Sequence, residues 1–446
     1  MKIIFGGLPF IYQRAIQGTM EFLGYNTIPL PEPDNESLKI GKEYCNRGQC
    51  NPTYYTTGNI IKFLKSYKNT KDLVVLTVGS CGPCRFGMYE MEYRKAIKEA
   101  GFNVPVLTFN QADALLNDME SFGIKMDKNF FIGLIKSIIS ADLVNDIYYK
   151  IKPYEVIPES ADVWKKESAQ LLYEFFRKGK SFENALKEIK GMLSDIKVNY
   201  LKPKPKVKIT GEFFAQTTEG EGNYKLARWL IEEGAEPIVE PVTTWIDYLI
   251  WERENSIKER MFKSRLEAIK KLILTKILGI YVRFLYNKGR KILNNIPSPL
   301  KDQRLIAKYA MDYYNPKLSG GEGHMEVGKH IYMIKHRKAH MVISVKPFGC
   351  MPSTQSDGVQ SKVIEDLKDT IFISVETSGD AEANFKNRIM MKLYEAKVKA
   401  VDEFENLKRK LKISGELRDK YTKADIKLPE KYTTTACNYL STLYSL

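Results

Sequence analysis

Short apolar runs alternate with longer amphipathic stretches along the first half of the chain. The apolar runs are rich in β-branched residues and predict buried parallel strands at Lys2–Phe5, Tyr25–Leu30, 72–78 and Val104–Phe109. The stretches between them predict helices at Tyr12–Leu23, Tyr54–Ser66, Met88–Ala100 and Met126–Tyr148. Residues 31–40 are rich in proline and polar residues and predict a linker. This β-α-β alternation predicts an open α/β sheet.

A break at Leu201–Lys206, where lysine and proline alternate, separates this half from a second one. Residues 150–200 before the break are charged and predict helices. Beyond it, a second α/β unit is predicted from Val207–Glu212, Asn223–Glu233, Pro237–Val242, Met341–Val345, Ile371–Val375 and Asn384–Leu411, with the alternation resuming near Ile331–Lys335.

The long helical stretch Thr244–Asn294 interrupts the second unit, and we expect it to carry a surface for a partner or for oligomerisation. The sequence therefore predicts an α/β protein with two Rossmann-like domains, whose parallel sheets are flanked by helices. We place the domains at 1–200 and 201–446, with a helical insertion at about 244–315 in the second.

Composition narrows the class of protein. With 446 residues, 43% of them hydrophobic and 28% charged, the chain is long enough for two or three globular domains. It has no apolar run near the roughly 18 residues that span a bilayer and no apparent signal peptide, so we expect a cytoplasmic protein that does not bind membranes. In that compartment, six cysteines favour metal or redox chemistry over a disulfide framework.

The formal net charge of +15 does not by itself indicate a nucleic-acid-binding protein. Lysine, arginine and glutamate alternate along the predicted helices, which is typical of solvated helical faces. No helix-turn-helix, zinc-finger or RNP-type motif accompanies the charge, so we expect no nucleic acid partner. An acidic partner or an anionic substrate fits the charge better.

The cysteines lie where open α/β sheets build their sites. Cys81 and Cys84 follow the strand at 72–78 and precede a helix, whose N-terminus favours thiolate over thiol. Cys45 and Cys50 also precede a helix, and Cys350 follows a strand at a turn that Gly349 permits. Cysteines of two domains could therefore meet in one cleft, and soft sulfur ligands select iron–sulfur clusters or zinc.

Three of these segments resemble the motifs of a known family. They read Cys50-Asn-Pro, Ser80-Cys-Gly-Pro-Cys84-Arg-Phe-Gly-Met-Tyr89 and Pro347-Phe-Gly-Cys350-Met-Pro-Ser353. In this order they are similar to the cysteine motifs of the 2-hydroxyacyl-CoA dehydratase and benzoyl-CoA reductase family, most closely its activase-associated and double-cubane branch. The segment from Asp380 to Arg388 resembles the end of that family's pattern, so the resemblance covers nearly the whole chain.

The resemblance implies two Rossmann-like domains that hold an oxygen-sensitive cluster, usually in a dimer, and we expect a homodimer. It also implies an iron–sulfur reductase or dehydratase-type component that acts on a small molecule. Low-potential electrons would come from a separate ATP-hydrolysing activator with its own iron–sulfur cluster. The chain itself contains no phosphate-binding P-loop motif.

The resemblance also implies the ligands. A single 4Fe–4S cubane would be held by Cys50, Cys84 and Cys350. A double-cubane cluster (8Fe–9S) would add Cys45, Cys81 and Cys437, which leaves no cysteine over. Arg85 and Gly349, beside the motif cysteines, are expected to contact the cofactor. The apolar side chains of Phe86, Phe348 and Met351 are expected to screen it from water.

Other interpretations of the same residues stay open. Cys81-Gly-Pro-Cys84 is also the dithiol of thioredoxin-like thiol–disulfide oxidoreductases, and a structural zinc site is a further alternative. The protein could equally be an electron carrier with no substrate of its own. Cys437 could be a free buried cysteine and Cys45 a plain loop thiol.

Two loops of the second half are further candidates. His324, in a glycine-rich segment, could donate a proton or contact substrate, or could be a surface loop residue. The loop from Thr217 to Asn223 could bind an anion, or could be a capping turn with Asn223 as the cap.

Overall fold

The computed structural model describes residues 1–79, 84–109, 122–259, 265–318, 321–379, 381–413, 417 and 419–444. The first half builds a four-stranded parallel sheet in the order β2-β1-β3-β4, so the α/β prediction is confirmed. Its strands are β1 (Lys2–Phe5), β2 (Thr27–Pro29), β3 (Leu73–Val78) and β4 (Val106–Phe109). In the register of β1 and β3, Ile3 lies beside Val74 and Ile4 beside Val75.

Both faces of this sheet are covered, as a parallel sheet requires. Because side chains alternate along a strand, Ile3 and Val74 face one side, where they pack with Met20 of α1 (Phe10–Phe22) and Phe130 of α6 (Lys128–Ile151). On the other side, Ile4 and Val75 pack against α3 (Asn51–Ser66) and α4 (Tyr89–Glu99). The helix α2 (Asn35–Tyr44) lies outside α3 and packs along it.

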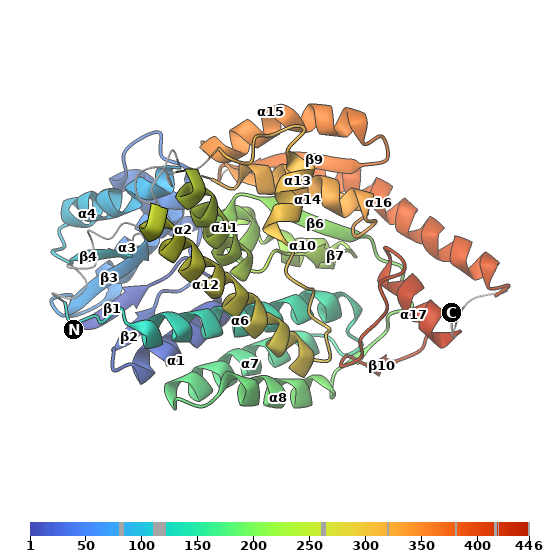
Figure 1. Cartoon of the computed structure of the whole chain (residues 1–446), viewed down its shortest axis with the longest axis horizontal. Coiled ribbons are helices and arrows are strands. Elements are labelled where there is room, and N and C mark those ends of the chain that lie inside the picture. Colours follow the sequence, from blue (N-terminus) through green and yellow to red (C-terminus); the bar gives the residue numbers. More distant parts are fainter. Residues whose placement is uncertain are drawn as a thin grey trace.

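The second half repeats this plan. Its parallel sheet has the order β7-β6-β8-β9, with β6 (Lys206–Gly211), β7 (Glu236–Ile238), β8 (Met341–Pro347) and β9 (Ile371–Thr377). One face packs against α10 (Leu226–Glu232) and α16 (Glu382–Lys410) through residues such as Leu230 and Ile389. The other face is covered by α14 (Gly323–Lys335), which α15 (Met351–Asp366) flanks. Figure 1 shows the two sheets and the N- and C-termini on opposite sides of the molecule.

The remaining elements lie beside the sheets. They are α7 (Ser160–Arg177), α8 (Phe182–Leu193), α9 (Phe213–Thr217), α11 (Thr243–Glu259), α12 (Arg265–Ile292), α13 (Gln303–Ala310), α17 (Thr435–Leu443), the short helices η1 (Arg85–Met88), η3 (Lys152–Tyr154) and η4 (Glu221–Asn223), and the antiparallel pair β5 (Lys197–Val198) and β10 (Thr422–Lys423).

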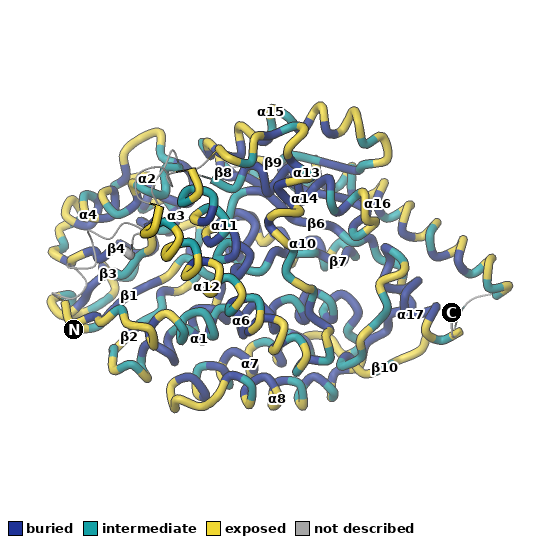
Figure 2. Tube along the Cα trace, in the orientation of Figure 1, coloured by how far each residue is buried: buried dark blue, intermediate teal, exposed yellow. Residues whose placement is uncertain are grey.

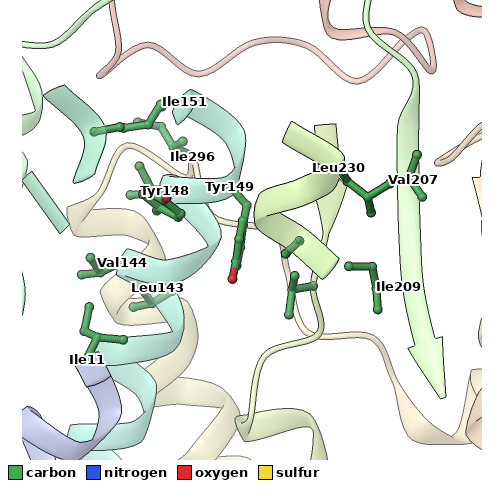
Figure 3. Packing of buried hydrophobic residues seen from close by; sticks show 14 of the residues in the cluster. Ile11, Leu143, Val144, Tyr148, Tyr149, Ile151, Val207, Ile209, Leu230 and Ile296 are labelled. Carbon is green, nitrogen blue, oxygen red and sulfur yellow. The ribbon is translucent and has the colours of Figure 1, made fainter. Parts of the chain in front are cut away.

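One hydrophobic core joins the two halves. It runs from Ile11 of α1 through Leu143 and Tyr149 of α6 to Ile209 of β6 and Leu230 of α10 (Figure 3). Figure 2 shows the buried part of the tube continuing between the two sheets. The predicted boundary near residue 200 is therefore a break in the sequence pattern, whereas the packing is continuous across it.

The helical insertion contains α11, α12 and α13, and α12 leaves one apolar stripe exposed. The exposed residues Leu266, Ile273, Ile277, Ile280 and Phe284 recur at helical spacing, while Val282 and Tyr286 face the core. An exposed apolar stripe of this length is typical of an interaction surface. That the insertion binds a partner stays a prediction. Even α12, like every helix in the described parts of the chain, lacks the apolar length needed to cross a membrane.

Two segments differ from the predictions. Residues 31–40, predicted as a linker, enter α2 because Asp34 accepts the backbone N–H of Ser37 at 2.8 Å and forms a capping box with that serine. Residues 331–335 form the end of α14, which begins at Gly323, so His324 lies in a helix and not in a loop. Asn223 accepts the N–H of Leu226 at 3.2 Å, but it lies in the short helix η4, and the residue at the N-cap of α10 is Lys225.

Candidate functional site

In both sheets the order of the strands reverses between the first and the third strand, and the candidate site lies at these two positions. In each sheet, the second strand of the chain lies on one side of the first strand, and the third and fourth strands lie on its other side. The strand order therefore reverses between β1 and β3 in one sheet and between β6 and β8 in the other. Open α/β sheets bind ligands outside the carboxyl ends of the strands at such switch points. Glu212 follows β6 there, and Cys350 follows β8.

Three motif cysteines stand immediately before helices. Cys50 precedes α3, Cys84 precedes η1 and Cys350 precedes α15, each with an extended backbone. Proline lies in the first turn of both α3 and α15, where its fixed φ suits a helix start and its missing N–H costs nothing. Free N–H groups and the dipole at the helix starts favour negative charge on ligands held there.

Backbone contacts bring the loops of these cysteines together across the two halves. Arg85 Nη1 donates to the Gly349 carbonyl oxygen at 2.7 Å, and Asn51 N donates to the Phe348 oxygen at 3.4 Å. We call the segments 49–51, 84–85 and 348–350 the cysteine seam. Arg85 and Gly349, both predicted to contact a cofactor, therefore contact each other.

Gly349 fits the cysteine seam because it has no side chain. Its φ is +79°, and a Cβ there would lie 2.6 Å from Arg85 Nη1 and 3.7 Å from Cys50 Cα. The left-handed turn and the close approach of Arg85 both require glycine at this position.

The thiols of the cysteine seam are held mostly in protein surroundings. Cys50 Sγ lies 3.0 Å from Tyr89 Oη, and Cys350 Sγ donates to Ser353 Oγ at 3.3 Å. Burial raises the pKa of Cys84 to about 12, and it raises the pKa of Cys350 still further. Nearby iron or zinc would reverse this effect, since a bound cation favours the thiolate. In the present side-chain arrangement, no group of three His, Cys, Asp or Glu within the described ranges could hold a metal ion.

The other three predicted ligands are Cys45, Cys81 and Cys437. Cys45, at the end of α2, is buried against Thr57, and burial raises its pKa to about 11. Cys81 lies outside the described residues. Cys437, in α17, is fully buried beside Thr434 and Glu403.

The position of Cys437 corrects the prediction of six ligands. Its neighbours Thr434 and Glu403 contact His340, which directly precedes β8, whereas Cys350 follows the other end of β8. The seven residues of that strand, at about 3.3 Å each, separate the two cysteines by roughly 20 Å. Figure 1 likewise shows α17 far from α3 and α4. Cys437 is part of the core, and it cannot share a cluster with Cys350 in this fold.

Three carboxyl groups lie beside the cysteine seam, and the sequence analysis did not single them out. Glu212 accepts the N–H groups of Phe214 and Ala215, and Glu322 accepts that of Phe213 at 2.9 Å. Glu326 accepts from Ser353 Oγ at 2.6 Å and so extends the hydrogen bond of Cys350. Although Glu212 is only half-buried, desolvation raises its pKa to about 8, and burial raises that of Glu326 to about 7. A charged residue on an otherwise buried helix face, as at Glu326, is the signal that could have found this group.

The apolar screen predicted around the cofactor is wrong for two of its three residues. Phe348 is 63% exposed and Met351 is 41% exposed, because the turn at Gly349 directs a carbonyl, not a side chain, toward Arg85. Phe86 is half-buried and packs edge-on against Tyr89. With the exposed Met88, Phe348 and Met351 form what we call the apolar rim, on the two segments that follow Cys84 and surround Cys350.

His324, the predicted catalytic candidate, is buried in α14. Its ring lies 5.6 Å from that of Tyr248 and 5.1 Å from that of Trp251, and neither ring nitrogen has a hydrogen-bond partner among the described residues. Burial lowers its pKa to about 4, so the ring is neutral at pH 7. The structure therefore places His324 in an aromatic pocket, and a neutral imidazole there is a poor proton donor.

Replacing His324 by phenylalanine is expected to remove part of the loss in unfolding free energy that the protein shows at acid pH. Because the folded pKa of His324 is depressed, its contribution is present above pH 6.5 and is lost as the pH falls toward 4. The free energy of unfolding of His324→Phe, relative to wild type, should therefore rise by about 2 kcal/mol between pH 7 and pH 5. Urea denaturation at both pH values measures this, and His336→Phe, at an exposed histidine, is the control. Parallel pH profiles for wild type and His324→Phe would contradict the assignment.

The position of Cys50 depends on two glycines where α2 crosses α3. A Cβ at Gly58 would lie 1.7 Å from the Ser37 carbonyl oxygen, and one at Gly41 would lie 1.9 Å from that of Tyr54. Backbone meets backbone at both points, so neither contact can relax by a side-chain rotation. The two helices, and the loop between them that carries Cys45 and Cys50, are therefore in fixed register.

We expect Gly58→Ala to destabilise the fold by about 3 kcal/mol, because the helices must move apart. Gly358→Ala is the matched control, since Gly358 lies in a helix with open space around its Cα and should be neutral or slightly stabilising. Thermal unfolding of both variants makes the comparison. Equal melting temperatures would show that the α2–α3 contact is looser than described.

Neither a scan of protein-family models nor a search of curated proteins finds a match to this chain.

Proposed function

We propose that the chain is an iron–sulfur protein whose cluster is held by Cys50, Cys84 and Cys350 at the cysteine seam. The observation that carries this proposal is the meeting of three distant segments, each with a cysteine before a helix start, through the contacts of Arg85 and Asn51. Three soft sulfur donors at helix N-termini suit an anionic iron–sulfur cluster. When bound, such a cluster supplies one-electron reduction at low potential.

The surroundings of the cysteine seam suit this chemistry. Arg85 places a positive charge beside the position of a negatively charged cluster and holds the loop of Cys350 through Gly349. Glu212, with a pKa of about 8, is mostly protonated at pH 7 and so does not repel an anionic group. Ser353 joins Cys350 to Glu326, which fixes the orientation of this loop.

A single 4Fe–4S cubane fits the chain better than a double cubane. The separation of Cys437 from Cys350 removes one of the six thiols that a double cubane needs. Three cysteines on a cubane leave one of its four irons without a protein ligand, and that iron is where a small substrate would bind.

The partners follow from the resemblance of the motifs. We infer that a separate ATP-hydrolysing activator, with its own iron–sulfur cluster, delivers electrons, and that the chain acts in the cytoplasm as a homodimer. The apolar rim of Met88, Phe348 and Met351 supports a partner at this face, since exposed apolar residues beside a reaction site are typical of a docking surface. The enzyme would be a reductase or dehydratase component that acts on a small molecule.

The thiol–disulfide alternative is weaker because it leaves Cys50 and Cys350, whose segments contact that of Cys84, without a role. An attacking thiol needs a lowered pKa, whereas burial raises the pKa of Cys84 to about 12. Its partner in the dithiol, Cys81, lies outside the described residues.

The test is the iron and acid-labile sulfide content of protein purified without air. We expect about four irons and about four sulfides per chain, with a spectrum that bleaches on reduction. Cyanide added to the reduced protein should change its electron paramagnetic resonance spectrum if one iron is open; an unchanged spectrum would favour an electron carrier. Zinc, or no metal, in protein never exposed to air would rule the proposal out.

A further inference from the structure

A second candidate site lies at the opposite end of the second sheet. A cavity of about 150 Å³ lies among the first residues of β6, the strand β7 with the loop after it, the helix α14, the loop before α13 and the C-terminal segment 426–438. Lys206 begins β6 and Lys338 precedes β8, so the cavity and Cys350 lie at opposite ends of these strands. No residue of the cysteine seam lines it.

The cavity has an excess of positive charge. Eight basic side chains and four carboxylates line it: Lys150, Lys206, Lys208, Lys301, Lys329, Arg337, Lys338 and Lys427, with Asp146, Glu236, Glu240 and Glu430. Walls that carry mostly one sign of charge focus the field inside a cleft and attract ions of the opposite sign.

The two buried lysines of the cavity, Lys208 and Lys329, have only one carboxylate between them. Lys208 Nζ lies 2.5 Å from Glu240 Oε2 and Lys329 Nζ lies 3.4 Å from Glu240 Oε1, so two lysines share one carboxylate. Both lysines are almost fully buried, with 2% and 3% of their surfaces exposed. Burial also lowers the pKa of Lys329, as expected for an ammonium group with too little counter-charge.

The mouth of the cavity adds two cations without a carboxylate partner. Within the described ranges, Lys301 and Arg337 have no acidic group at ion-pair distance, and Lys301 Nζ instead lies 5.1 Å above the ring of Tyr332. Arg337 adopts a left-handed backbone (φ +48°) at the turn between α14 and β8. Lys338 and Lys427 share Glu430, at 2.8 and 3.0 Å.

We propose that this cavity binds a phosphate group, either as inorganic phosphate or as part of a small phosphorylated molecule. A doubly charged oxyanion would neutralise the unpaired ammonium and guanidinium groups, and it has enough oxygens to accept from several of them at once. The cavity is several times the volume of a water molecule, so it holds a phosphate group with a few waters. A space of about 150 Å³ is too small to hold a nucleic acid strand or a lipid surface, so we infer a small ligand.

The test is calorimetric titration of the full chain with inorganic phosphate, pyrophosphate and glucose 6-phosphate, at constant ionic strength set with chloride. We expect saturable binding of about one phosphate group per chain and a matching rise in melting temperature. Tighter binding of glucose 6-phosphate than of inorganic phosphate would identify a phosphorylated molecule as the ligand, and the reverse order would identify free phosphate.

The double variant Lys301→Gln with Arg337→Gln removes the two unpaired cations and should weaken binding at least tenfold. Neither side chain forms an ion pair with a described residue, so the melting temperature without ligand should stay near that of wild type. Lys291→Gln, at an exposed lysine outside the cavity, should bind as wild type does. No saturable binding of any phosphate probe, or equal affinity in the double variant, would overturn the proposal. The result does not depend on whether the chain carries iron.

Discussion

Cys84→Ser and Cys350→Ser are each expected to lose most of the bound iron, from about four atoms to fewer than one per chain. Each thiol is one of three ligands, and the serine hydroxyl is a harder and weaker ligand for iron than thiolate sulfur. Cys50→Ser should do the same, because Cys50 lies at the third helix start of the cysteine seam. Iron and sulfide analysis of anaerobically purified variants, with their absorption spectra, measures the effect.

Cys437→Ala is the matched control for these variants. Its side chain is more deeply buried than those of the proposed ligands, but it lies at the far end of β8. It should therefore keep the iron content of wild type, even if it is somewhat less stable. Full iron in both Cys84→Ser and Cys350→Ser, or loss of iron in Cys437→Ala alone, would contradict the proposed ligand set.

The fold could be predicted well wherever the pattern of apolar residues is local. The strand at Lys2–Phe5 has the predicted bounds, and the strand predicted at Ile371–Val375 extends by only two residues, to Thr377. The helix α2 was missed because two prolines directly precede its start, and only the capping box of Asp34 with Ser37 marks it. The start of α14 was missed because glycines before His324 indicate a loop. Polar side chains on the buried face of this helix also weaken its amphipathic pattern.

The motif residues of the site could be predicted from the sequence, but the residues that pack around them could not. The cysteines before helices were identified, because a cysteine, a turn and a proline in the first turn form a local signal. The contribution of Glu212 and Glu322 depends on tertiary packing, and nothing near them in sequence indicates it. The exposure of Phe348 was missed for the same reason, since its direction depends on the contact between Arg85 and Gly349.

The segments of the cysteine seam come from both halves of the chain, so they meet only if the two sheets keep a fixed position relative to each other. That position depends on the shared core around α6, where the buried polar residue Asp142 contacts both halves. Its carboxylate accepts from Tyr12 Oη at 2.7 Å, from the N–H groups of Val242 and Thr243 at 2.6 and 2.8 Å, and from Thr243 Oγ1. One side chain of α6 thus ties α1 of the first half to the start of α11 in the second.

Asp142→Ala is therefore expected to be among the most destabilising single changes in the chain. It leaves the polar groups of Tyr12, Val242 and Thr243 without their partner in a site where Asp142 is 1% exposed, which costs about 3–5 kcal/mol of unfolding free energy at pH 5. Tyr12→Phe is the graded comparison, because it removes one donor and leaves three bonds to the carboxylate. It should cost about 1 kcal/mol.

The cost of Asp142→Ala should also depend on pH. Burial raises the pKa of Asp142 to about 7, above its value of about 4 in the unfolded chain, so its contribution to stability declines as the pH rises from 4 through 7. The difference in unfolding free energy between wild type and Asp142→Ala should therefore be clearly smaller at pH 8 than at pH 5. Urea denaturation at the two pH values decides this. A difference that grows with pH would mean that the four donors keep Asp142 ionised in the folded protein, and that hydrogen bonding outweighs desolvation where the two halves of the chain meet.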